Sequence, residues 1–110
     1  MELGFRYIIN THFHGDHVYG NQYFLPGPII EYENCRLDLD TKWKSNFGRY
    51  WAREALRPEL SRIRKTLPDV TFRDHMSLWF GNREIQLSYH GGVHSNSDIL
   101  LYLPYDKVLF

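Results

Sequence analysis

The chain has 110 residues, of which 43% are hydrophobic and 24% charged, the composition of a folded globular domain rather than of a disordered segment. Its 13 basic residues balance 13 acidic ones, so no net charge attracts phosphate backbones or anionic lipids, and nucleic acid is not expected as a partner. The apolar runs are short, as in ILLYL at 99–103, and predict neither a membrane span nor a secretory signal.

The first predicted element is a short strand at FRYIIN (5–10), which is rich in β-branched and aromatic residues. HVYGNQYF (17–24) predicts one or two helical turns. LPGP (25–28) ends them because its prolines cannot continue a helix. IIEYE (29–33) then predicts a second strand.

From residue 34 to 67 the apolar spacing changes to steps of three and four, which predicts a pair of amphipathic helices. Pro58 suits the first turn of the second helix, over PELSRIRKTL (58–67). We expect the aromatic stripe of this segment to pack in the core rather than to form a substrate platform. The apolar positions are Trp43, Phe47, Tyr50, Trp51, Leu56, Leu60, Ile63 and Leu67.

The remaining elements are predicted strands. VTFRD (70–74) is followed by a hairpin over 76–91 that turns at FGNRE, and DILLYLP (98–104) and KVLF (107–110) flank a tight turn. This order predicts an α/β or α+β fold with a mixed sheet and packed helices. We expect strands from both sides of the helical segment to share one sheet, with residues 34–67 packed outside it.

Histidines are concentrated at the end of the first strand, in INTHFHGDHVYGN (9–21). His12, His14 and Asp16 are spaced by two, so on an extended chain their side chains project to one side. His17 breaks this alternation and approaches from elsewhere if Gly15 lets the backbone turn. The spacing predicts a loop that folds around a metal ion at a strand end.

Imidazole nitrogens and a carboxylate oxygen favour zinc, with iron or manganese as possible substitutes. His12 and His14 need a third strong ligand, and the best distant candidate is His94, in the glycine-rich segment GGVHSNSD. His75 and His90 compete for that role. A His-rich loop that simply faces solvent is the alternative interpretation.

Two segments resemble a known family. THFHGDHVYGN resembles the metal-binding signature of the metallo-β-lactamase superfamily, and GGVHSNSDILLYLPYDKVLF resembles its second histidine segment, where Ser95 and Ser97 depart from the usual threonine and glycine. The resemblance implies an αββα-type fold. It also implies that His12, His14 and His94 hold one zinc and that Asp16 and His17 contribute to a second.

By the same resemblance, the family's metal-bridging aspartate and last histidine would follow Phe110, and a sheet would precede residue 1. We therefore expect residues 1–110 to form a single, partial metallo-β-lactamase-like domain. Taken alone, this chain is expected to be a weak or inactive hydrolase that binds at most one zinc tightly.

The predicted function is metal-dependent hydrolysis. Three imidazoles leave one position on zinc for water and lower the pKa of that water towards about 7, which suits attack on an ester, thioester, lactone or lactam. Asp16 is the catalytic candidate, to orient the water or accept its proton. Asp98 is expected to support an imidazole, and Thr11 to support Asp16, through hydrogen bonds.

Two alternatives remain open: a mononuclear iron enzyme of the same fold that oxidises sulfur, and a metal-binding fragment without catalysis. The expected partner is a small-molecule substrate. The sequence indicates neither the substrate, nor the oligomeric state, nor the localisation.

Overall fold

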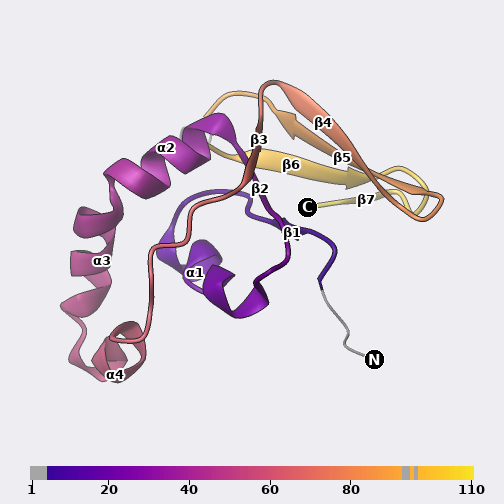
Figure 1. Ribbon diagram of the computed structural model, residues 1–110. Helices are drawn as coiled ribbons and strands as arrows, with labels where there is room; N and C mark the ends of the chain where they lie inside the picture. Colours follow the sequence, from indigo (N-terminus) through magenta and orange to yellow (C-terminus); the bar gives the residue numbers. More distant parts are fainter. Residues whose placement is uncertain (1–4, 93–94, 96) are drawn as a thin grey trace, which may run out of the picture.

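The computed structural model describes residues 5–92, 95 and 97–110. It contains two sheets and a helical arm (Figure 1). The first sheet is parallel, in the order β1 (Ile8–Ile9), β2 (Ile29–Tyr32) and β3 (Val70–Phe72). The second is antiparallel, in the order β4 (His75–Phe80), β5 (Arg83–Tyr89), β6 (Ile99–Leu103) and β7 (Val108–Leu109).

The pairing of strands across the helical segment is confirmed, because Ile30 of β2 pairs with Val70 of β3. The expectation of one shared sheet holds only for β3. Strands β4 to β7 form the separate antiparallel sheet, since the chain reverses at Arg73 and Asp74, where Asp74 has a φ of 59°. The hairpin predicted at FGNRE is confirmed, and Gly81 supplies its positive φ of 62°.

The helical arm consists of α2 (Glu33–Thr41), α3 (Trp43–Trp51), a 3₁₀ turn (Glu54–Leu56) and α4 (Arg57–Leu60). In Figure 1 it runs down one side, away from β4 to β7. The second predicted helix is shorter than expected. After Leu60 the backbone bonds to the 3₁₀ helix at Asn21–Phe24 instead, where Gln22 Nε2 donates to the carbonyl of Arg62 at 2.9 Å and Gln22 Oε1 accepts from the amide of Arg64.

The core lies between the two sheets and α2. Tyr32 of β2 stacks on Tyr89 of β5, with ring centroids 3.9 Å apart. The buried core comprises Phe13, Val18, Ile30, Tyr32, Cys35, Leu39, Phe72, Leu87 and Ile99. Ile9 of β1 packs against this core and Ile99 of β6 belongs to it, so the strand before the histidine loop and the strand after the second motif belong to one packed unit.

The aromatic stripe of α3 meets the expectation only in part, because Trp43 packs against the main core while α3 buries none of its residues fully. Trp43, Phe47 and Trp51 stack in a ladder, with centroids 5.9 Å apart at each step. Outside the arm, the ring of Tyr19 lies 5.2 Å from that of Trp43, centroid to centroid. The stripe thus packs against the segment that follows the histidine cluster and, through Trp43, against the edge of the main core.

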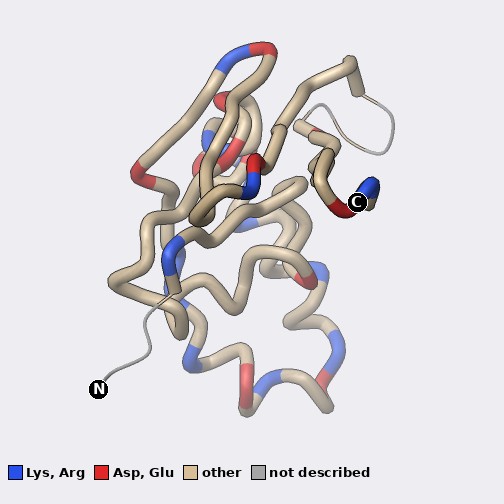
Figure 2. The backbone as a smooth tube through the Cα atoms, turned by 90° about the vertical axis from the view of Figure 1, so that its right-hand side faces the viewer, with Lys and Arg blue, Asp and Glu red and all other residues tan. Residues whose placement is uncertain are grey.

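The described part of the chain contains no helix long and apolar enough to cross a membrane. Basic and acidic residues are both distributed over the described backbone (Figure 2).

Candidate metal centre

The histidine loop begins where β1 ends and is closed by two buried asparagines. Asn10 Nδ2 donates to Asn21 Oδ1 at 3.0 Å, and Asn21 Nδ2 donates to Asn10 Oδ1 at 2.8 Å. Asn10 Nδ2 also lies 3.2 Å from the carbonyl of His17, which it can bond. Sequence reasoning missed both residues, although an asparagine at each end of the histidine motif was the available signal.

Between these asparagines the chain turns into α1 (Gly15–Val18), with His14 at the N-cap position. The role of Gly15 differs from the one expected. Its backbone is helical, and glycine is required because a Cβ there would lie 2.4 Å from the ring of Tyr19. That ring is held in place by Trp43, Phe47 and Tyr50 of α3.

The structure brings the imidazoles of the cluster together. The ring centroid of His12 lies 5.0 Å from that of His14 and 3.9 Å from that of His17. His17 Nε2 lies 3.3 Å from Asp16 Oδ2, and both side chains are substantially exposed, at 44% and 66%. The cluster is therefore open to a ligand arriving from solvent.

Thr11 lies beside the first imidazole. Its hydroxyl is 3.2 Å from His12 Nδ1, so the contact found for Thr11 is with His12 rather than with Asp16, the partner expected from the sequence. A hydrogen bond in which Nδ1 donates would leave the lone pair on Nε2 and orient the ring for a metal.

The second motif segment approaches the first at β6. The amide of Ile99 donates to the carbonyl of Thr11 at 3.1 Å, which ties the start of β6 to the residue before His12. Just upstream, Asp98 accepts hydrogen bonds from Ser95, at 2.8 Å from its amide and 2.6 Å from its hydroxyl. His94 lies outside the described residues, so its part in the site stays a prediction.

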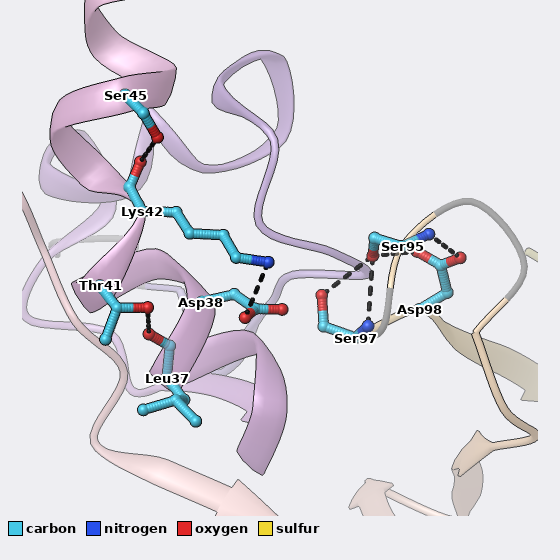
Figure 3. A network of polar contacts seen from close by, with 8 residues as sticks. All are labelled: Leu37, Asp38, Thr41, Lys42, Ser45, Ser95, Ser97 and Asp98. Carbon is cyan, nitrogen blue, oxygen red and sulfur yellow. Dashed lines mark hydrogen bonds and ion pairs between the residues drawn. The ribbon is translucent and has the colours of Figure 1, made fainter.

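Figure 3 shows this serine–aspartate loop together with α2. Ser97 is fully buried and its hydroxyl lies 3.1 Å from that of Ser95. Asp98 thus fixes the loop that follows position 94, whereas support of an imidazole by Asp98 remains a prediction.

Beneath the loop, α2 and β2 carry buried polar groups. Burial is the main cause that raises the pKa of the Cys35 thiol, with the nearby Glu31 carboxyl adding to it, while a hydrogen bond with Ser97 opposes the shift. Burial also raises the pKa of Glu31 to about 7. Among the described residues the Cys35 thiol is a hydrogen-bond partner of the Glu31 carboxyl, which opposes this shift, while neither carboxyl oxygen bonds a nitrogen or oxygen donor. The protonated thiol makes Cys35 unsuited to act as a nucleophile.

The competing histidines lie on the antiparallel sheet. His75 is exposed at the start of β4, and His90 is exposed just after β5, with Nε2 2.8 Å from Ser88 Oγ. Within the described ranges, no three His, Cys, Asp or Glu side chains are arranged to hold a metal ion. The donors that do meet are imidazole nitrogens and one carboxylate, a set that fits zinc once a third ligand joins His12 and His14.

Comparison with known proteins decides the family. The model of the metallo-beta-lactamase superfamily matches residues 2–110. The chain belongs to this superfamily. Its members commonly bind metal ions and hydrolyse their substrates, and the expected partial metallo-β-lactamase fold is confirmed.

Among solved structures, this chain is similar to a metallo-beta-lactamase from Pontibacter korlensis, at 25% identity and a TM-score of 0.64. The match covers 93% of this chain and 39% of that one, so the chain spans well under half the length of this relative. No curated protein matches.

Proposed function

We propose that this chain carries the metal-binding half of a zinc-dependent hydrolase that attacks esters, thioesters, lactones or lactams. The observation that supports this most is the meeting of the His12, His14 and His17 rings beside Asp16, in a chain of the metallo-β-lactamase superfamily. The comparisons favour neither the iron-dependent oxidative alternative nor a fragment without catalysis.

In this proposal His12, His14 and His94 hold the first ion, and Asp16 and His17 contribute to a second. When bound, zinc supplies Lewis acidity, which polarises a carbonyl group and makes water more acidic. Thr11 fixes the ring of His12 through Nδ1, and Asp98 fixes the loop that follows His94. Both keep ligands in place without contacting the substrate.

Asp16 is the proposed proton acceptor. Its carboxylate is exposed and lies at the start of α1, 3.3 Å from His17 Nε2. From this position it can orient a water molecule and accept its proton as the water attacks the carbonyl carbon. His17 holds Asp16 at a defined distance from the other imidazoles.

The direct test is zinc-dependent turnover. Purified chain is loaded with zinc or with iron and assayed on a generic ester, thioester, lactone and lactam. We expect slow hydrolysis with zinc that His12→Ala abolishes and that His75→Ala leaves unchanged, because His75 lies on β4. Equal turnover in wild type and His12→Ala would refute the proposal, as would activity with iron alone.

A further inference from the structure

A pocket of about 300 Å³ adjoins the candidate metal centre, and the mechanism above does not use it. We call it the Tyr19 pocket. Asp16 and Tyr19 form one wall, and Tyr50, Leu56, Leu60 and Ile63 of the helical arm form the other. The pocket therefore starts at the proposed proton acceptor and extends under the arm.

The walls are mainly apolar. Tyr50 lies 5.4 Å from Tyr19, ring centroid to ring centroid, in an edge-on arrangement, and the leucines and Ile63 complete the surface. The volume is at the lower end of the range of small-molecule sites and about twice that of an engineered cavity that binds benzene. A single aryl ring with a short linker, or a medium-length acyl chain, fits such a space.

The charges of the walls select against anions. The charged residues that line the pocket are Asp16 and Glu59, and no lysine or arginine is among its described lining residues. In the metal-free chain, a carboxylate placed there would lose its hydration without gaining a cation. An uncharged group avoids this cost.

A hydrogen-bonding group without a partner belongs to the Tyr19 side chain, whose ring lines the pocket. The hydroxyl of Tyr19 is buried and has no hydrogen-bond partner within the described part of the chain. A buried polar group without a partner is costly, and a shift of the Tyr19 ring on ligand binding would let a carbonyl oxygen of the ligand accept its hydrogen bond.

We propose that the Tyr19 pocket binds the uncharged apolar part of the substrate, an aryl or medium-chain acyl group, and holds its carbonyl near Asp16. This inference rests on the proposed function, because it takes Asp16 as part of the catalytic centre. It narrows the substrate class to neutral esters, thioesters or lactones with an apolar substituent.

The test is ligand binding to the metal-free 110-residue chain, monitored by NMR signals of the isoleucine methyl groups. 4-Phenylbutanamide is the neutral probe and 4-phenylbutanoate the anion of the same size. We expect the amide to shift the Ile63 methyl signal saturably while Ile85 of β5 stays unchanged, and the anion to bind at least about tenfold more weakly. No shift at Ile63, or equal shifts at Ile85, would overturn the proposal.

Variants at the pocket sharpen this test. Leu56→Ala should weaken amide binding about tenfold, the scale expected for apolar groups lost from a pocket, whereas Leu37→Ala on α2 should not. Tyr19→Phe should weaken amide binding severalfold. Glu59→Gln should reduce the difference in affinity between the amide and the anion. The matched change Glu54→Gln should leave this difference unchanged. If the Glu59 and Glu54 variants behave alike, charge selection by the pocket is wrong.

The pocket and the hydrolase proposals fail separately. Amide binding at Ile63 in a chain whose zinc binding His12→Ala and His14→Ala leave unchanged would refute the proposed function, whereas the proposal for the pocket would stand. Zinc-dependent turnover without any change of the Ile63 methyl signal would refute the proposal for the pocket, whereas the proposed function would stand.

Discussion

The backbone amide of Ile99 donates a hydrogen bond of 3.1 Å to the carbonyl oxygen of Thr11. This bond joins the residue that precedes the first histidine of the cluster to the residue that follows Asp98. Because the bond is made between backbone groups, it holds the two motif segments together irrespective of their side chains. The third zinc ligand is therefore expected from the segment just upstream of Ile99.

The first prediction is that His94 completes the site with His12 and His14. In a zinc-loaded structure their ring nitrogens should lie within about 3–4 Å of each other, as zinc–nitrogen bonds of about 2.0–2.1 Å require. His94→Ala should weaken zinc binding by more than the roughly 10–100-fold typical of losing a ligand's hydrogen-bond partner. His90→Ala is the matched control, since His90 bonds Ser88 on the antiparallel sheet. Equal losses in the two variants would contradict the assignment.

The second prediction concerns the amide pair that closes the histidine loop. Asn21→Ala removes both hydrogen bonds with Asn10 and leaves the buried Asn10 amide short of a partner. The free energy of unfolding should fall by about 1–3 kcal/mol, the cost of a buried polar group without a partner. Urea unfolding followed by circular dichroism measures this. Asn46→Ala on α3 is the control and should be neutral or slightly stabilising.

The same Asn21→Ala variant should also bind zinc more weakly than wild type at a temperature where both are folded. In the variant the loop must become ordered when zinc binds, whereas in the wild type the amide pair already orders it before binding. A destabilised variant with unchanged zinc affinity would show that Asn10 and Asn21 hold the fold but not the site.

The third prediction is a pH dependence from Glu31, whose folded-state pKa of about 7 lies above its ordinary value of 4.5. Between these values the folded state holds the proton that the unfolded state has lost. The contribution of Glu31 to the free energy of unfolding is therefore fully present below about pH 4.5. It is lost as the pH rises through about 7, and it amounts to roughly 3 kcal/mol.

Glu31→Gln keeps the shape of the side chain without the charge. It should stabilise the chain at pH 8 and remove this part of the pH dependence, measured as the difference between wild-type and variant unfolding curves from pH 4.5 to 8. Because wild type and variant carry the same histidines, the contribution of histidine titration cancels in this difference. The exposed Glu54→Gln is the control, and a parallel pair of curves for Glu31→Gln and wild type would contradict the prediction.

The fourth prediction is the metal stoichiometry of the 110-residue chain. A second ion would have only Asp16 and His17 as ligands here, which leaves too many positions to water for tight binding. Equilibrium dialysis with metal analysis should find at most about one tightly bound zinc per chain. Two tight ions would show that further residues of this chain, such as His75 or His90, complete the second position.

The sequence by itself determined the local elements and the family. The hairpin at FGNRE, the strand at IIEYE and the helical spacing of residues 34–67 depend on turn residues and periodicity, which act over a few positions. The histidine cluster could also be recognised from the sequence, because its residues are neighbours along the chain.

Only the tertiary structure decided how these pieces combine. Asn10 and Asn21 form a pair because the loop between them closes, and Gly15 is required because the ring of Tyr19, held by α3, covers it. The division into two sheets and the Tyr19 pocket likewise arise from contacts between residues far apart in sequence. Such contacts depend on burial and on which surfaces meet, and neither spacing nor composition encodes these locally.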